Sequence, residues 1–227
     1  MKKIMFNDRY GLTQAVIDGR KSMTRRKLTL TLHERQSGDT LKEVYPDKVF
    51  CEDGKWMFEC AGKAYPLPKE NYPRYNLGEE VAVAQNYNDA GIRPWQCVEA
   101  KVNLRFYSDY RLTQAMDTKG WRNKMYVKSD LMPHRILING IHCERLQDIS
   151  DADCLREGVL FRRIGYYVKG LIADCEKESY IECPDGKCYK LFPTPRKAFA
   201  ALVDKVSGRG TWQRNPWVVV YEFKLVK

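Results

Sequence analysis

The chain has 227 residues, a length that favours one large domain over two small ones. Apolar residues make up 44% and charged residues 30%, and no apolar run approaches the ~20 residues of a membrane span, which argues against a membrane protein. Lys and Arg outnumber Asp and Glu by 39 to 29, so the formal charge is +10, which favours a polyanionic partner over a merely solvated surface. The first residues are basic without a following apolar stretch, so we expect no signal peptide and a cytoplasmic location.

The first half of the chain begins with a predicted helix over residues 10–19, where Gly19 is placed to end it in a left-handed conformation. A strand is expected over 27–32. Residues 34–75 are polar and weakly patterned, and we interpret them as an insertion that carries a hairpin around Gly54.

Further strands are expected from runs of apolar and β-branched residues, at 77–85, 96–107, 124–128, 135–146 and 218–223. The strand over 135–146 contains Gly140, which indicates a bulge. Two more helices are predicted, one opened by Ser150 and ended by Gly158, the other running from the Thr194 cap to Gly208.

The order of these elements is that of an α+β domain. Several short strands, three short helices and no βαβ rhythm favour a mixed barrel over a doubly wound sheet. We therefore expect a single domain over 1–227, with insertions at about 34–75 and 160–193.

The eight cysteines are expected to be reduced thiols, because nothing in the sequence indicates secretion. Cys175, Cys183 and Cys188 could chelate zinc, but structural zinc sites use closer pairs with a matching second pair. The preferred interpretation is a hairpin with a Pro-Asp-Gly turn on which Cys183 and Cys188 face each other. We expect no metal site and no cofactor, since the sequence has neither a phosphate-binding loop nor a dinucleotide fingerprint.

The sharpest local feature is Gly-Arg-Lys-Ser-Met-Thr-Arg-Arg at residues 19–26, where four cations follow a helix end. Strand alternation would send Lys21 and Arg25 to one face and Thr24 and Arg26 to the other. Like charges are crowded unfavourably here unless they are solvated or meet an anion. Both a solvated basic turn and an anion site fit this pattern.

Glu157 is the second feature, because an acidic side chain in the last turn of a helix opposes the helix dipole, at a typical cost of ~0.3–1 kcal/mol. A neighbouring Lys or Arg would be enough to hold it there. Aromatic residues alternate with basic ones at 72–75, 105–110 and 162–167. Such segments could stack bases beside phosphate contacts, or they could be ordinary loops that cover the edge of the core, and the pattern favours neither.

These pieces, in this order, resemble the ASCH family of the PUA-like superfamily, above all its larger members from phages and prophages. The matching segments cover about half of the chain and are Asp-Gly-Arg-Lys-Ser-Met-Thr-Arg-Arg (18–26), Leu-Gly-Glu-Glu-Val-Ala-Val (77–83), Met-Pro-His-Arg-Ile (132–136), Glu-Arg-Leu-Gln-Asp-Ile-Ser (144–150), Glu-Gly (157–158), Trp212 with Asn-Pro-Trp-Val (215–218), and Tyr-Glu-Phe (221–223).

The resemblance implies a PUA-like β-barrel with a cleft beside the Gly-Arg-Lys-x-x-Thr turn that binds RNA or a nucleotide. The basic and aromatic residues expected to bind it are Arg20, Lys21, Arg25, Arg26, Lys128 and Trp217.

A small family member with the same turn is an acetylcytidine amidohydrolase, and its catalytic residues fall on Lys21, Thr24 and Glu157. A crowded, partly desolvated Lys21 would have a lowered pKa and could act as a general base on the Thr24 hydroxyl or on a water, with Glu157 as the proton shuttle. The alternative is a tight Lys21–Glu157 ion pair in a cleft that only binds. The sequence leaves both open, and the three side chains are expected to converge on one cleft.

Overall fold

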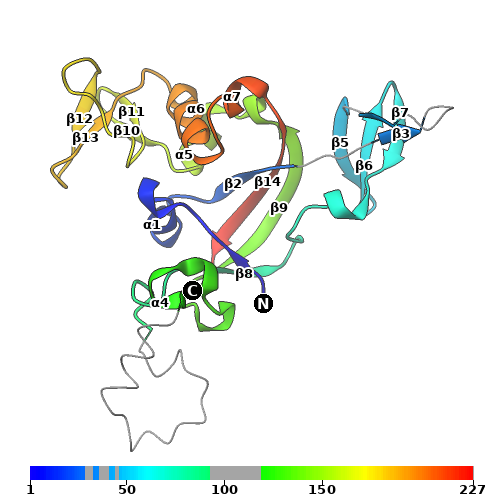
Figure 1. Ribbon diagram of the computed structural model, residues 1–227, viewed down its shortest axis with the longest axis horizontal. Helices are drawn as coiled ribbons and strands as arrows, with labels where there is room; N and C mark the ends of the chain where they lie inside the picture. The colour runs from blue at the N-terminus through cyan, green and yellow to red at the C-terminus, as the bar shows by residue number, and fades with distance from the viewer. Residues whose placement is uncertain (29–32, 36–40, 44–45, 93–118, 227) are drawn as a thin grey trace, which may run out of the picture.

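The computed structural model describes residues 1–28, 33–35, 41–43, 46–92 and 119–226. Its centre is a five-stranded sheet in the order β1 (Lys3–Ile4), β8 (Glu80–Val83), β9 (Arg135–Arg145), β14 (Trp217–Leu225) and β2 (Met23–Lys27), drawn in Figure 1. The β1–β8 pair is parallel and the other three pairs are antiparallel. The molecule is therefore an α+β protein built on a mixed sheet.

Within the described part of the chain the sheet does not close, so the expectation of a barrel is wrong in this respect. Its edges, β1 and β2, are not paired with each other. Instead of a backbone ladder, the Arg26 guanidinium donates to the Met5 carbonyl, 2.6 Å away, across the space between them. The physical reason is the length of β1, because two residues offer too few backbone groups to pair with β2 as well as with β8.

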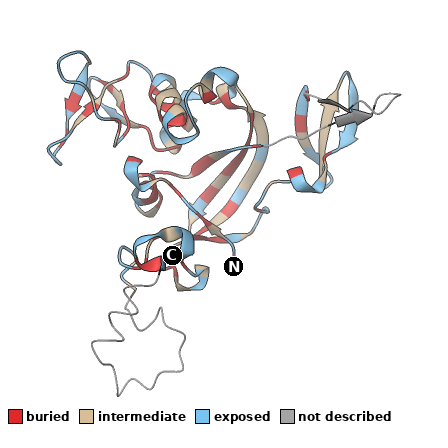
Figure 2. Cartoon of the chain, viewed as in Figure 1, coloured by how far each residue is buried: buried red, intermediate tan, exposed pale blue. Residues whose placement is uncertain are grey.

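The strand predictions are confirmed for β8, β9 and β14, although the boundaries differ by a few residues. Between β9 and β14 the register passes from Gly140 opposite Glu222 to Ile138 opposite Phe223, so Asn139 is the extra residue of the predicted bulge. Five consecutive residues of β14, Trp217 to Tyr221, are buried (Figure 2). Both faces of this central strand are therefore covered.

Three other strand predictions are not confirmed as made. The strand expected over 27–32 begins earlier, as β2 at Met23, and residues 29–32 lie outside the described residues, as does the strand expected over 96–107. The strand expected over 124–128 is wrong, because Lys124–Tyr126 is a 3-10 helix that is capped by Asn123. A side-chain cap on the backbone of a short polar segment competes with strand pairing.

The predicted helices are confirmed, and local signals bound each of them. Helix α1 (Leu12–Ile17) is followed by Gly19 at φ 72°, and α5 (Asp151–Arg156) is opened by Ser150 and followed by Gly158 at φ 109°. Helix α6 (Pro195–Val206) is capped by Thr194. Two four-residue helices, α4 (Lys119–Arg122) and α7 (Thr211–Arg214), were not expected.

The main core unites the sheet with α1, α5 and α6, which lie on one side of it in Figure 1. Ile136, Ile138 and Val220 are fully buried there. A second, smaller cluster lies around α4 and is made of Ala82, Ala84, Tyr87, Trp121, Val127 and Met132. No helix in the described part of the chain is long and apolar enough to cross a membrane.

The first insertion carries β3 (His33–Arg35) paired with β4 (Leu41–Glu43) and a three-stranded antiparallel sheet of β5 (Lys48–Glu52), β6 (Lys55–Cys60) and β7 (Lys63–Pro66). The predicted hairpin around Gly54 is confirmed: Asp53 and Gly54 both have positive φ, as the tightest hairpin turns require. Val49 and Leu67 belong to the main core, which ties this insertion to the domain.

The second insertion consists of two hairpins, β10 (Leu160–Arg162) with β11 (Gly165–Tyr167) and β12 (Tyr180–Glu182) with β13 (Cys188–Lys190). The predicted Cys183–Cys188 turn is a hairpin turn, but the two thiols do not face each other, because Cys188 lies opposite Glu182 and Cys183 is buried among Tyr167, Ile181 and Tyr189. Among the described residues, the seven cysteines are free thiols and no group of three or more His, Cys, Asp or Glu could hold a metal ion.

Candidate functional site

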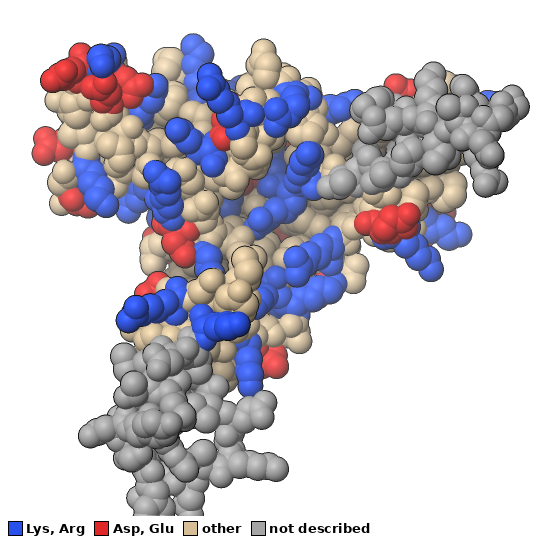
Figure 3. Space-filling view, viewed as in Figure 1, with Lys and Arg blue, Asp and Glu red and all other residues tan. Residues whose placement is uncertain are grey.

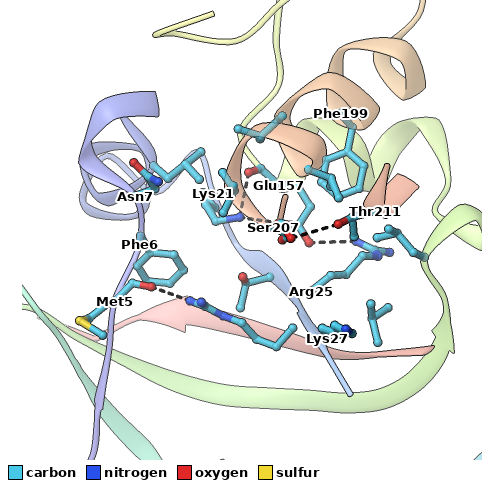
Figure 4. A pocket seen from close by; sticks show the side chains of 18 of the residues that line it. Met5, Phe6, Asn7, Lys21, Arg25, Lys27, Glu157, Phe199, Ser207 and Thr211 are labelled. Carbon is cyan, nitrogen blue, oxygen red and sulfur yellow. Dashed lines mark hydrogen bonds and ion pairs between the residues drawn. The ribbon is translucent and has the colours of Figure 1, made fainter. Parts of the chain in front are cut away.

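A pocket of about 680 Å³ lies between the two edges of the sheet, within the ~300–1,000 Å³ range of small-molecule sites. Residues that follow β1 form one side, β2 forms the floor, and α6 with the end of α5 forms the opposite side (Figure 4). The open sheet edge thus provides the site, because a closed barrel would fill this space with backbone pairing.

Lys21 lies at the inner end of the pocket, and its side chain is 2% exposed. Its ammonium donates three hydrogen bonds, to the Met23 carbonyl at 2.7 Å, to the Glu157 carbonyl at 2.8 Å and to Glu157 Oε2 at 2.6 Å. These acceptors take all three protons of the ammonium. Burial lowers the pKa of Lys21, and the Glu157 carboxylate opposes that shift.

Glu157 caps the C-terminal end of α5, where the helix dipole disfavours it. Two cations compensate: Lys21 contacts Oε2, and Arg25 Nη1 donates to Oε1 at 3.2 Å. The predicted convergence of Lys21 with Glu157, 136 residues apart in the chain, is therefore confirmed. The acidic residue at this helix end is explained by its two partners.

Arg25 is the centre of an ion-pair network, and its side chain is only 2% exposed. It contacts Glu144 at 2.7 Å, Asp153 at 3.5 Å and Glu157 at 3.2 Å. Burial opposes ionisation of Glu144, but hydrogen bonds from His142 and Arg25 outweigh it and lower the pKa of Glu144. Arg25 is thus neutralised inside the protein and has little charge left for a ligand.

Thr24 is buried beside Lys21 and lines the same pocket with Glu157. Its hydroxyl makes no hydrogen bond to any other residue that the structure describes, so it is available to a bound molecule. The three residues singled out as a possible catalytic set therefore share one pocket.

The pocket wall carries more positive than negative charge, as the gathering of Lys and Arg around the central recess in Figure 3 shows. Six basic residues line it, Arg9, Lys21, Arg25, Arg26, Lys27 and Lys124, against two acidic ones, Asp8 and Glu157. Lys124 pairs with Asp8 at 2.7 Å, whereas Lys27 is exposed and forms no ion pair with another described residue. Lys21, Arg25 and Lys124 are paired with carboxylates, so the cations of the wall that form no ion pair with a described residue are Arg9, Arg26 and Lys27, and these favour an anion.

The side of the pocket formed by α6 is apolar. Phe199, Leu202, Val203 and Val206 project toward it at helical spacing. Opposite them, the Phe6 ring lies 5.7 Å from both the Lys21 ammonium and the Arg26 guanidinium. A ligand that fits must combine a flat or apolar part with negative charge.

Of the residues expected to bind nucleic acid, Lys21, Arg25 and Arg26 line this pocket, and Arg20, Lys128 and Trp217 do not. Arg20 and Lys128 are exposed elsewhere, and Arg20 pairs with Asp18 at 2.9 Å. Trp217 is buried: its indole N–H donates to the Pro46 carbonyl, and Arg145 lies 4.7 Å from its ring. Trp217 is therefore out of place in the expected nucleic-acid-binding set, because its buried side chain does not reach the pocket.

Lys21 and Arg25 both contact Glu157, and Arg25 contacts the Met23 side chain, as expected for one face of the 21–26 segment, but Thr24 and Arg26 of the other predicted face also line the pocket. Lys21 precedes β2, and β2 is an edge strand with the pocket at its open side. Of the aromatic-basic segments, Tyr75 and Tyr167 are buried, and 105–110 lies outside the described residues.

Sequence reasoning missed Glu144 and Asp153, the apolar side of α6 and the contribution of Lys27. Charge compensation was the available signal, since a buried arginine needs carboxylates, but only the β2–β14–β9 register identifies Glu144 as one of them.

No protein-family model, curated protein or solved structure matches this chain.

Proposed function

We propose that the pocket binds a nucleotide or a nucleotide unit of a nucleic acid, with RNA as the preferred class. Three cations without an ion pair to a described residue, Arg9, Arg26 and Lys27, face an apolar wall, and this combination carries the proposal. A base can lie against the apolar side chains of α6 while its phosphate meets Arg26 and Lys27, two of the pocket cations that have no carboxylate partner among the described residues.

The ordered motifs that resemble the ASCH family support the same proposal, and with it a PUA-like origin of the fold. Two of those motifs, at 18–26 and 157–158, meet in the pocket through the Lys21–Glu157 contact. A shared pocket is what a common functional role for the two motifs requires.

The test compares cytidine with its 5′-monophosphate by calorimetric titration. We expect the monophosphate to bind about tenfold more tightly or better, and Lys27→Ala with Arg26→Ala to remove that advantage. Lys63→Ala, on an exposed strand of the first insertion, is the matched control and should leave it intact. Equal binding of both compounds, or none of either, contradicts the proposal.

A second function is supported by the shared location of Lys21, Thr24 and Glu157, namely amide hydrolysis on an acylated cytidine. Lys21, once it has lost a proton, would activate the Thr24 hydroxyl or a water to attack the acyl carbon, and Glu157 would carry a proton to the leaving amine. Water supplies the atoms that the products, a carboxylic acid and cytidine, require.

Acetate release from N4-acetylcytidine tests this second function. Lys21 and Glu157 are buried and paired, so their removal would affect folding as well as catalysis. Thr24→Val is the sharper variant, because it keeps the side-chain shape and removes only the hydroxyl, which has no partner among the described residues. We expect it to abolish turnover where the hydroxyl is the nucleophile, to spare turnover where a water is, and in both cases to leave nucleotide binding within about twofold. Wild-type protein that binds but never releases acetate leaves only the binding function.

A further inference from the structure

A second group of basic side chains lies beside the pocket, on the segment from the 3-10 helix η1 (Asp8–Tyr10) to the turn after α1 and on the second insertion. It consists of Arg9, Arg20, Arg162, Arg163 and Lys169, called the outer basic surface below, and all five are exposed. Apart from Arg20 with Asp18, none of them forms an ion pair with another described residue. Clustered cations without carboxylate partners favour an external anion.

The two segments that carry this surface are packed directly on each other. The Lys169 side chain lies against Gly11, 3.3 Å from where a Cβ would stand, and the Arg9 carbonyl lies so close to Gly170 that a Cβ there would clash at 2.2 Å. Burial raises the pKa of Tyr167, and the charges of Arg162 and Arg20, from the two segments, oppose that shift. The cations therefore share one region.

The outer basic surface is continuous with the pocket through Arg9, which belongs to both. In Figure 1 the β10–β11 hairpin stands next to α5 and α6, the helices that form one side of the pocket. The hairpin thus extends the basic region away from the pocket opening.

The tip of the β10–β11 hairpin has side chains that a tight turn does not need. Arg163 and Ile164 form a two-residue loop, where Asn and Gly are usual, and Ile164 is 65% exposed. Next to it Phe161 is 59% exposed and its ring lies 5.0 Å from that of Tyr166. An exposed ring in a segment that also carries Arg162 and Arg163 suits base stacking by a single-stranded nucleic acid.

This hairpin is held firmly in place. Tyr166 exchanges two backbone hydrogen bonds with Phe192, at 2.9 and 2.7 Å. Gly165 allows this approach, because a Cβ there would lie 2.8 Å from the Phe192 carbonyl oxygen. A preorganised surface loses little conformational entropy when a ligand binds.

We infer that the ligand is a single-stranded polynucleotide that continues from the pocket over the outer basic surface, with a base stacked on Phe161 and its phosphates at Arg9, Arg162 and Lys169. This inference rests on the proposed binding function and extends it from one nucleotide unit to several. The neighbouring β12–β13 hairpin is acidic, with Glu176, Glu178 and Asp185 around it, and it bounds the path on that side.

The test measures the fluorescence anisotropy of labelled RNA and DNA oligonucleotides of about a dozen residues, beside calorimetry with cytidine monophosphate. The variant carries Arg162→Ala, Arg163→Ala and Lys169→Ala. The matched control carries Lys55→Ala, Lys63→Ala and Lys69→Ala, three exposed lysines of the first insertion at the opposite end of the molecule in Figure 1. Both lose three positive charges, so the control accounts for the change in net charge.

We expect the variant to bind the preferred oligonucleotide about tenfold or more weakly than wild type, the control within about twofold, and both to bind the monophosphate like wild type. Phe161→Ala alone should weaken binding of the oligonucleotide about fivefold. Unchanged oligonucleotide binding by the variant, with monophosphate binding intact, overturns the extended path and leaves the proposed function standing. Wild-type protein that binds neither probe overturns the proposed function itself.

Discussion

At the scale of single residues, the Lys21–Glu157 contact combines full burial with full hydrogen bonding. A buried ion pair of this kind adds little compared with an apolar pair, but losing one partner leaves the other charged and desolvated. If Lys21 is replaced, Glu157 keeps its contact with Arg25, but the Met23 and Glu157 carbonyls lose the ammonium that donates to them.

Lys21→Met, which keeps the length of the side chain, should therefore lower the free energy of unfolding by about 3–5 kcal/mol in urea denaturation near neutral pH. Lys21→Met combined with Glu157→Gln should cost less than the sum of the two single changes, because the second change removes the charge that the first left unpaired. A loss below about 1 kcal/mol for Lys21→Met would show that the pair is not formed as described.

The cysteines offer a prediction about pH. Burial raises the pKa of both Cys143 and Cys154 to about 12, so near pH 8 only about one in ten thousand of these thiols is a thiolate. Cys51 and Cys175 are exposed. Disulfide-exchange reagents should modify Cys51 and Cys175 within minutes under native conditions, whereas Cys143 and Cys154 should react only after denaturation, as peptide mapping can determine.

The sign for stability follows from the same shifts. The unfolded chain releases these two thiol protons at a lower pH than the folded protein does, so the free energy of unfolding falls as pH rises from about 8.5 toward 12. Rapid native labelling of Cys154 would contradict the buried position of that residue.

At the scale of elements, the turn after α5 sets the position of Glu157. Gly158 has φ 109°, and a Cβ there would stand 2.9 Å from Leu12 Cδ2 on α1. A side chain at this position would strain the backbone and push α1 away from α5, and with it Lys21 away from Glu157.

Gly158→Ala should lower the free energy of unfolding by about 2–3 kcal/mol and weaken ligand binding. Gly186→Ala is the matched control: Gly186 also has positive φ, at 72°, but nothing lies within 4 Å of its Cβ position. It should cost only the backbone strain, about 1 kcal/mol, and leave binding unchanged. Equal costs at the two positions in thermal or urea unfolding would rule out the Leu12 contact as the cause.

The elements also show what local sequence can predict. Gly19, Ser150 and Thr194 act on the backbone next to them, so the helix ends that they determine were predictable. The strand order was not, because β14 pairs with residues about 80 and about 195 positions earlier in the chain.

The same division holds within the candidate site. Crowded like charges at 19–26 and an acidic residue at a helix end each indicated a missing partner, and the resemblance to a family joined the two. Glu144 and the apolar side of α6 gave no such signal, since only tertiary packing brings Glu144 to Arg25 and α6 to the pocket. The burial of Trp217 was unpredictable for that reason as well, because its cover includes Pro46 of the first insertion.

At the scale of the whole molecule, the positive charge of +10 should appear in the salt dependence of binding. Arg25 is unsuitable for this test, although the sequence favoured it, because three carboxylates already neutralise it. Arg26 and Lys27 are exposed cations on the floor of the pocket and suit the test.

For a single-stranded oligonucleotide, replacing both Arg26 and Lys27 by Ala should reduce the slope of log K against log salt by about 1.4, or ~0.7 for each lost phosphate contact. The slope is measured by anisotropy titrations between about 50 and 200 mM salt. An affinity of the wild type that is indifferent to salt would remove the polyanion argument altogether.

The place of β14 in the sheet has a consequence for synthesis on the ribosome. It is the last of the five strands to be translated, yet it lies between β9 and β2 and is paired along its length with β9. Until it emerges, β2 has no neighbour in the sheet, and β9 exposes one edge and its apolar side chains. The nascent chain therefore remains open to edge-to-edge association and to chaperones over most of its synthesis, and the pocket floor forms only when its final strand is in place.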